Sequence, residues 1–377
     1  MKVSVLQENL AYGLGIVSRA VSSRSTLPVL SNILLATDEG RLRLSATNLE
    51  LGITCWIGAK IEEDGSTTVP SRTFNDLVST LSGQTVDLSL TVRTQTLNVL
   101  SGTSNTNIKC IDAQEFPPML AADTSDGIQI NVADLREMIQ QVALAASSDE
   151  ARPVLTGVMV KVEGNTVTMS AADGFRLSRR RVELSSPVSQ DFAAIIPARA
   201  LSELARVAGD TDQVVTMSLP KERNQVVFHL KDIELVSQLI EGTYPNVEQV
   251  IPKSHTTRTI VSTAAFLKAC KQAEIFAREG THIARINIVP GGDLQPGKVE
   301  ISGQSEETGF NQTDVEASIE GSALLIAFNV RFLREVLEII KTPNVVLETM
   351  ADNSPGLIKP AGEQDFLHVI MPMHLGS

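Results

Sequence analysis

The chain has 377 residues, of which 42% are hydrophobic and 20% charged, and its net charge is −12 at pH 7. This length predicts two or three domains, and the acidic balance argues against a protein coated with nucleic-acid-binding charge. Three cysteines lie far apart in the sequence, which is typical of free thiols in a reducing cytoplasm. The first residues lack the apolar run of a signal peptide, and no stretch is apolar enough to span a membrane. We therefore expect a cytoplasmic protein.

A strand followed by an apolar-periodic helix recurs three times, at intervals of roughly 130 residues. A second strand and helix recur inside each repeat with the same period. Asn131, Ser262 and Asn329 are candidate N-caps, because their side-chain oxygens can accept hydrogen bonds from the first helical N–H groups. The six predicted helices span 7–24, 71–82, 131–146, 198–208, 264–279 and 329–341.

Between the helices, polar and apolar residues alternate at 41–46, 85–92 and 165–170. This period is typical of half-buried antiparallel strands. Each repeat therefore predicts two helices packed on an antiparallel sheet, which is an α+β architecture. The repeat boundaries predict three similar domains, which span residues 1–122, 127–250 and 254–377.

The predicted helices hold twelve basic and nine acidic residues, although the whole chain is acidic. Lysine and arginine are good helix formers, so solvated helix faces explain this difference most simply. A mildly basic surface made of helices, beside acidic sheets, is the alternative, and the count alone leaves it open.

No pattern in the sequence requires catalysis. The five histidines lack metal-ligand spacing, and no nucleophile elbow occurs. Segment 292–298 has phosphate-loop spacing, but Val299 replaces the magnesium-binding hydroxyl and Pro296 removes an N–H group. Asp173 lies in an Asp-Gly pair, which is typical of a turn. We expect no enzyme, no cofactor and no metal.

Seven motifs, spread in order from one end of the chain to the other, resemble the family of bacterial replicative sliding clamps, the beta subunits of DNA polymerase III. They lie at 24–35, 46–50, 69–72, 172–177, 241–245, 328–330 and 369–375. The resemblance implies a clamp fold in which three α+β domains form half of a closed ring. It implies a homodimer that encircles double-stranded DNA, independently of sequence, and tethers its partners for processive synthesis. Those partners are the polymerase catalytic subunit and the clamp loader, which bind through short linear peptide motifs.

The resemblance also implies three sets of site residues. Four arginines match positions near the DNA backbone: Arg24, Arg72, Arg152 and Arg199. A pocket for partner peptides is expected from Leu155, Ala172, Gly174, Phe175, Arg176, Leu177, Pro245, Val250, Val369, Met371, Pro372, Met373 and Leu375. The dimer interface is expected to pair Thr103, Asn105 and Ile108 of one subunit with Ile275, Phe276, Glu306 and Glu307 of the other.

Two other interpretations compete with the clamp. One is a monomeric, β-rich binding scaffold that shares only the repeat, and retention on circular DNA would distinguish it from a ring. The other is an enzyme with an unrecognised site between domains, and the lack of convergent histidines, cysteines or paired carboxylates argues against it. Because all seven motifs occur in the family's order, we favour the clamp.

Overall fold

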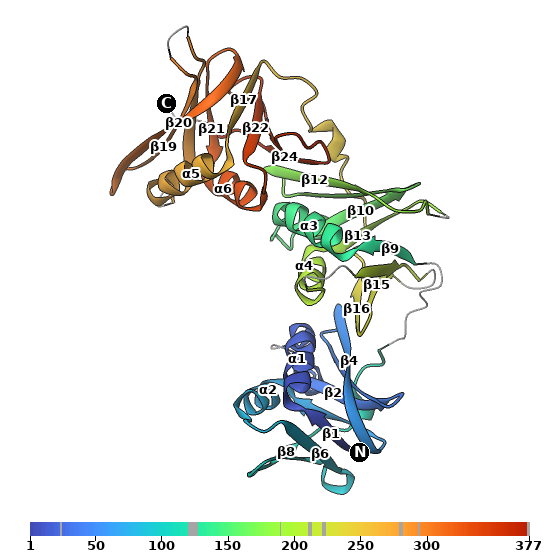
Figure 1. Ribbon diagram of the computed structural model, residues 1–377. Coiled ribbons are helices and arrows are strands. Elements are labelled where there is room, and N and C mark those ends of the chain that lie inside the picture. The colour runs from blue at the N-terminus through green and yellow to red at the C-terminus, as the bar shows by residue number, and fades with distance from the viewer. Residues whose placement is uncertain are drawn as a thin grey trace. The chain divides into compact units, whose positions relative to one another are not determined.

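The computed structural model describes residues 1–22, 25–119, 127–188, 190–209, 213–220, 224–278, 282–292 and 295–374. They form two compact units, each built around its own twelve-stranded sheet (Figure 1). The first unit comprises residues 1–133 and 203–239, and the second comprises 134–202 and 240–377. The middle of the chain therefore contributes strands to both sheets.

The first unit contains two helices and twelve strands among its described residues. Its elements are β1 (Lys2–Leu6), α1 (Gln7–Val17), β2 (Asn32–Asp38), β3 (Arg41–Thr47), β4 (Leu51–Glu63), β5 (Ser66–Pro70), α2 (Ser71–Thr80), β6 (Thr85–Thr91), β7 (Thr96–Ser101), β8 (Ser104–Lys109), β9 (Ile128–Asn131), β14 (Val214–Ser218), β15 (Gln225–Leu230) and β16 (Ile233–Gln238).

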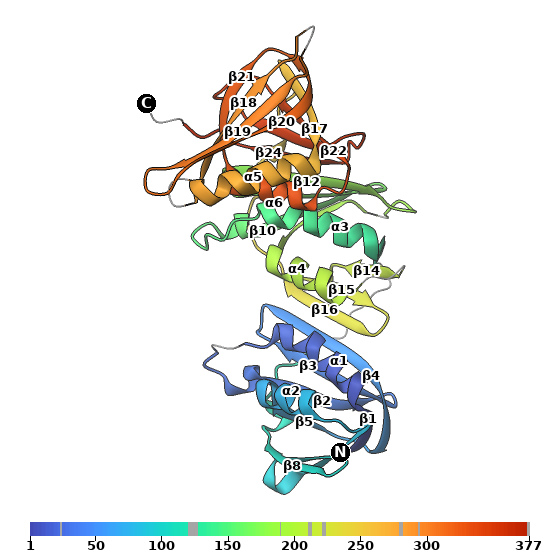
Figure 2. The ribbon, with the colours of Figure 1, turned by 60° about the vertical axis from the view of Figure 1, so that its left-hand side comes forward.

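The long strand β4 organises the sheet of the first unit. Its residues 51–55 pair with β16, whereas residues 59–63 pair with β1, so one strand joins two stretches of sheet. Helices α1 and α2 lie side by side, and α1 packs on β3 and β4 (Figure 2). Gly13 permits this close packing, because an added Cβ would lie 2.5 Å from Cδ1 of Leu44.

The second unit carries the remaining elements, and helices α3 and α4 span the sequence division between the units. They are α3 (Val132–Val142), β10 (Gly157–Glu163), β11 (Thr166–Ala172), β12 (Arg176–Glu183), β13 (Phe192–Pro197), α4 (Ala198–Val207), β17 (Thr257–Ser262), α5 (Thr263–Ala277), β18 (Ile283–Val289), β19 (Lys298–Ser305), β20 (Gly309–Gly321), β21 (Leu324–Asn329), α6 (Val330–Ile339), β22 (Asn344–Thr349), β23 (Gly356–Pro360) and β24 (Phe366–Ile370).

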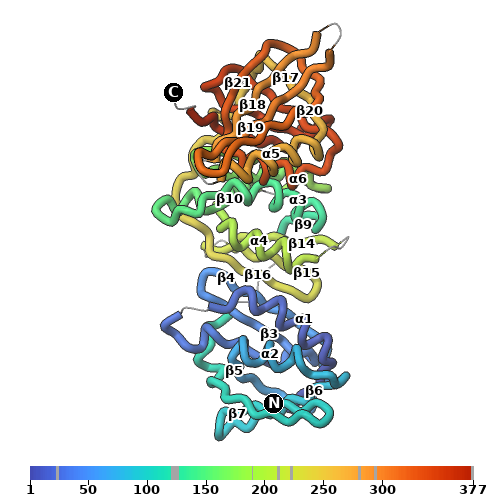
Figure 3. The backbone as a smooth tube through the Cα atoms, turned by 90° about the vertical axis from the view of Figure 1, so that its left-hand side faces the viewer, coloured from blue at the N-terminus to red at the C-terminus, as the bar shows by residue number. Residues whose placement is uncertain are grey.

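The sheet of the second unit runs in the order β13, β10, β11, β12, β24, β23, β22, β17, β20, β19, β18 and β21. Helices α5 and α6 lie side by side (Figure 3). Phe266, Phe328 and Leu333 are fully buried in the core beneath them. Every strand pairing that the described residues make is antiparallel, which confirms the predicted α+β class.

The N-caps are confirmed, but two helices are shorter than predicted. Asn131, Ser262 and Asn329 each accept a hydrogen bond from a backbone N–H group of the following turn. Helix α1 ends at Val17 and α3 at Val142, and a single 3-10 turn follows each. Apolar periodicity continues through a 3-10 turn, so the pattern alone extended these helices too far.

Candidate functional site

An apolar groove of about 80 Å³ lies in the second unit, where β11, β12 and β24 meet the segment that follows Tyr244. It is lined by Ala172, Gly174, Arg176, Leu177, Val247, Val250, Val369 and Met371. Seven of these eight residues belong to the peptide pocket expected from the sequence. Val247 was not expected, although its spacing of three residues from Val250 could have indicated it.

The other expected pocket residues do not line this groove. Phe175 is exposed at the β11–β12 turn, and its carbonyl accepts a hydrogen bond from the Met371 N–H group at 2.8 Å. The lining likewise does not include Leu155, Pro245, Pro372 and Met373. Leu375 lies outside the described residues.

Strand pairing builds the floor of the groove. Leu177 of β12 pairs with Val369 of β24, and both side chains are buried in one apolar cluster with Leu357 and Leu367. The turn before β12 is tight, because Gly174 has φ +96° and Asp173 Oδ1 accepts hydrogen bonds from two backbone N–H groups. The groove is therefore formed by regular backbone structure.

The guanidinium of Arg176 is held on several sides at this floor. Its side chain is only 8% exposed, and its Nε donates to Asp173 Oδ2 at 3.1 Å. Its Nη1 donates to Glu335 Oε2 at 2.5 Å, and its Cζ lies 4.2 Å from the ring centroid of Phe332. A buried cation is tolerated only when it is paired in this way.

The connecting segment that forms the groove wall is attached to the sheet at two points. The Tyr244 hydroxyl accepts a hydrogen bond from the Ala172 N–H group at 3.0 Å, and burial raises the pKa of Tyr244 to about 12. Nη1 of Arg179 reaches both carboxylate oxygens of Glu248, at 2.8 and 2.7 Å. Glu248 lies between Val247 and Val250, so this ion pair fixes the wall that they form.

The expected DNA-contacting arginines lie on separate elements. Arg72 is exposed in the first turn of α2, 3.9 Å from Asp76 Oδ2, and Arg199 is exposed in the first turn of α4. Arg152 precedes a 3-10 turn, and its Nε donates to Asp149 Oδ2 at 3.1 Å. Arg24 lies outside the described residues.

The residues expected at a dimer interface fall on two strand edges. Thr103 and Asn105 are exposed and Ile108 is buried along the β7–β8 hairpin, and β8 is the last strand of its sheet. In the second unit, Ile275 is exposed at the end of α5, Phe276 is half-buried, and Glu306 and Glu307 are exposed between β19 and β20.

Phe310, at the start of β20, is 57% exposed and was not expected from the sequence. It lies within four residues of both expected glutamates, and the polar run that follows it makes one exposed aromatic residue conspicuous. It adds an apolar side chain to this edge of the second unit.

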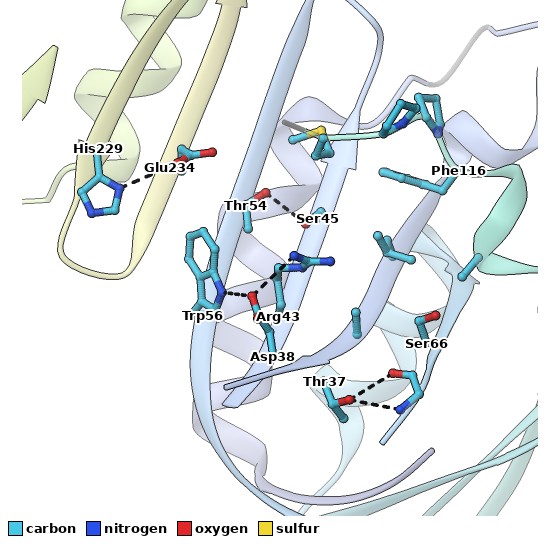
Figure 4. A pocket seen from close by; sticks show the side chains of 17 residues that line it. Thr37, Asp38, Arg43, Ser45, Thr54, Trp56, Ser66, Phe116, His229 and Glu234 are labelled. Carbon is cyan, nitrogen blue, oxygen red and sulfur yellow. Dashed lines mark hydrogen bonds and ion pairs between the residues drawn. The ribbon is translucent and has the colours of Figure 1, made fainter. Parts of the chain in front are cut away.

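A second, larger cavity of about 840 Å³ lies in the first unit, beneath residues 113–119 (Figure 4). On its wall, Trp56 Nε1 donates to Asp38 Oδ2 at 2.8 Å, and the hydroxyl groups of Ser45 and Thr54 are 3.0 Å apart. Phe116 lies across the cavity from Trp56 (Figure 4). None of the site residues expected from the sequence lines this cavity.

The described part of the chain offers neither a metal site nor a membrane-spanning helix. No three histidine, cysteine or acidic side chains there are arranged to hold a metal ion. No helix of the described residues is long and apolar enough to cross a membrane.

Comparison with known proteins covers the whole chain. Models of the DNA polymerase III beta subunit match residues 1–120 as the N-terminal domain, 129–246 as the central domain and 248–374 as the C-terminal domain. The beta sliding clamp of Synechococcus elongatus is 31% identical over 380 residues and covers 100% of both chains. That of Staphylococcus aureus is 31% identical over 364 residues and covers 94% of each chain.

Solved structures agree with this assignment. The DNA polymerase sliding clamp from Bacillus subtilis matches with a TM-score of 0.93 and 28% identity, and the match covers 100% of both chains. The DNA polymerase III subunit beta from Pseudomonas aeruginosa matches with a TM-score of 0.89 and 27% identity, also over 100% of both chains. The chain therefore belongs to the family of the DNA polymerase III beta subunit, and its function is that of a sliding clamp, a non-catalytic processivity factor of DNA polymerase.

Proposed function

We propose that two copies of this chain close head to tail into a ring around duplex DNA, and that partner peptides dock in the groove of the second unit. We also propose that residues 1–122, 127–250 and 254–377 are the three repeats of the clamp. Two complementary strand edges support the ring, and the preformed groove supports the docking of peptides.

The sheets of neighbouring repeats are joined in the same way: part of a strand in one repeat pairs with the last strand of another repeat. Residues 51–55 of β4 pair with β16, and residues 176–180 of β12 pair with β24, which are the last strands of the second and third repeats. In β20, residues 317–321 pair with β17, but residues 309–315 have no described strand on that side. Strand β8, the last of the first repeat, pairs only with β7 among the described strands. By the same pattern of pairing, β8 of a second copy would pair with residues 309–315 of β20.

Side chains complement this backbone pairing. The β20 edge presents Phe310 and Ile275, and the partner's edge would present Asn105 beside the buried Ile108. Burying Phe310 and Ile275 would contribute about 2 kcal/mol each. Because no base stands in the 103–108 segment opposite Glu306 and Glu307, we expect an interface that depends weakly on salt.

The dimer is tested by small-angle scattering and sedimentation across protein concentrations. The wild-type protein should have twice the chain mass of 40.6 kDa. Phe310→Asp should raise the dimer dissociation constant by at least tenfold, whereas Leu325→Asp, at another exposed apolar position, on β21, should leave it unchanged. A wild-type mass of one chain at every concentration would contradict the ring.

Weak phosphate contacts suit a clamp that slides, because tight or base-specific binding would arrest it. We propose that Arg24, Arg72, Arg152 and Arg199 supply such contacts, since Arg72 and Arg199 are exposed near helix N-termini. Arg72→Ala with Arg199→Ala should shorten retention of the loaded ring on nicked circular DNA about twofold to fivefold. Unchanged retention over a range of salt would contradict this role.

Peptide docking is tested with a fluorescent peptide that carries the short linear motif of the polymerase catalytic subunit. Val250 lines the groove and is 45% exposed, so Val250→Asp should weaken binding at least tenfold without disturbing the core. Val214→Asp is the matched control, because Val214 is 47% exposed and lies outside the groove. Equal affinity of both variants would contradict the proposed pocket.

A further inference from the structure

We infer that Glu335 on α6 is a positioning residue for the groove, because it holds the Arg176 side chain in the conformation that lines it. The inference rests on the proposed docking of peptides. It concerns a residue that lies outside the groove lining and 159 positions from Arg176 in the sequence.

Arg176 needs partners from two different parts of the chain. Asp173 is local, since it lies in the turn before β12 and takes the Nε proton at 3.1 Å. Glu335 comes from α6 and takes an Nη1 proton at 2.5 Å, while Phe332, one turn earlier on that helix, stacks on the guanidinium at 4.2 Å. Without α6, the distal end of the guanidinium would be left without a carboxylate.

Glu335 is itself fixed, so it can act as an anchor. It also accepts a hydrogen bond from Arg331 Nε at 2.7 Å, and Arg334 Nη2 lies 3.8 Å away. Burial acts to raise the pKa of Glu335, but the hydrogen bonds from Arg176 and Arg331 outweigh it and hold the pKa below its usual value. The carboxylate therefore stays ionised at neutral pH.

The effect on the groove follows from side-chain entropy. An arginine side chain has many accessible rotamers, and a free Arg176 would occupy several conformations, some of them across the groove. Fixing it before binding removes the entropic cost of ordering it from the association step. A groove that is formed in advance also keeps its shape between successive partners.

A double-mutant cycle tests the inference with the same fluorescent peptide. Glu335→Gln should weaken binding about tenfold, and Arg176→Ala should weaken it at least as much. In the Arg176→Ala background, Glu335→Gln should have no further effect, because Glu335 acts only through Arg176. Glu338→Gln is the matched control, since Glu338 lies on the same helix as Glu335, pairs with Lys271 and Arg334, and does not line the groove.

Three results would overturn the inference. The first is unchanged affinity in Glu335→Gln when Arg176→Ala weakens binding. The second is an equal loss from Glu335→Gln in both backgrounds, which would mean that it acts elsewhere. The third is a wild-type protein that does not bind the peptide at all, which would overturn the proposed docking as well. If Glu335→Gln folds poorly by circular dichroism, Glu335→Asp keeps the charge, and full wild-type affinity in that shorter variant would likewise contradict a positioning role.

Discussion

The junctions that join one repeat's strands to the next differ in chemistry although their backbone pairing is the same. In the first unit, Ile53 of β4 pairs with Leu235 of β16, and both side chains are fully buried. At the corresponding place in the second unit, Ser178 pairs with His368, and their side chains share a hydrogen bond of 2.6 Å. The central side-chain pair of such a junction can therefore be apolar or polar. The polar pair of Ser178 and His368 lies next to the groove, because Leu177 and Val369 line it.

The connecting segments beside these junctions also differ: one is held by an apolar contact and the other by an ion pair. In the first unit, Met119 packs against Gly52, with a large cavity beneath the segment. In the second unit, Glu248 is tied to Arg179, and the space that remains is the small groove. Of these two segments, the one that borders the proposed binding groove is the one held by an ion pair.

The largest expected effect comes from the apolar floor of the groove. Leu177→Ala removes a nearly fully buried side chain and should lower the free energy of unfolding by about 2–5 kcal/mol. Denaturant titration followed by circular dichroism measures this change. Trp56, the single tryptophan, lies in the first unit, whereas Leu177 lies in the second. Tryptophan fluorescence therefore follows unfolding of the first unit only and does not replace circular dichroism here. A loss below 1 kcal/mol would mean that the floor can collapse around the missing side chain.

The next effect is a dependence of the free energy of unfolding on pH, which we expect from the polar junction and not from the apolar one. Burial, with a smaller contribution from the charge of Arg176, lowers the pKa of His368 to about 3 from its ordinary value of 6.5. Between these values the unfolded chain binds a proton that the folded chain does not. Stability should therefore fall as the pH falls below 6.5, by at most about 1.4 kcal/mol per pH unit.

Replacing the polar pair with an apolar pair tests whether His368 causes this dependence on pH. The double substitution Ser178→Ile with His368→Leu copies the apolar pair of the first unit. It should flatten the slope of unfolding free energy against pH between 6.5 and 4. The variant Ile53→Val should keep the wild-type slope, because it leaves His368 intact. An unchanged slope in the double variant would assign the acid sensitivity to other groups.

A smaller effect is expected from the ion pair that ties the connecting segment. Glu248 is more than half exposed, so solvent screens its pair with Arg179, and we expect a contribution of about 1 kcal/mol. Glu248→Gln should therefore weaken peptide binding about threefold to fivefold, chiefly through faster dissociation. Glu363→Gln, which breaks the ion pair of Arg180 on the same strand, is the control. Stopped-flow fluorescence separates the two rate constants.

The smallest effect belongs to an ion pair that takes part in neither junction. Arg72 and Asp76 are 3.9 Å apart, with side chains 96% and 76% exposed. Asp76→Asn should change the free energy of unfolding by less than about 0.5 kcal/mol, as is usual for surface pairs. A change above 1 kcal/mol, measured by denaturant titration, would show that helix-surface charges matter more than the comparison predicts.

Much of this architecture could be predicted from the sequence, because its signals are local. The caps at Asn131, Ser262 and Asn329 depend on residues two or three positions away. Six of the groove residues lie in short motifs that resemble the family. These features need only the order of neighbouring residues.

The features that the sequence did not predict are pairings over long sequence distances. Ser178 and His368 are 190 positions apart, and Arg176 and Glu335 are 159 apart. Periodicity assigns a residue to a face of a strand or helix, but it does not reveal which distant residue meets it there. Val247 and Phe310 escaped prediction for a related reason, since their surroundings depend on how distant strands come together.

The two open strand edges have a consequence for self-recognition. An exposed edge invites pairing with any other strand, so a chain that exposes β8 and part of β20 risks uncontrolled assembly. Here β8 offers the short polar side chains of Asn105 and Asn107, whereas the edge at β20 offers Phe310 beside Glu306 and Glu307. Two β8 edges would have little apolar surface to share, and two β20 edges would bring four glutamates together. Pairing of like edges is therefore disfavoured, and the side chains favour the pairing of unlike edges that the proposed ring requires.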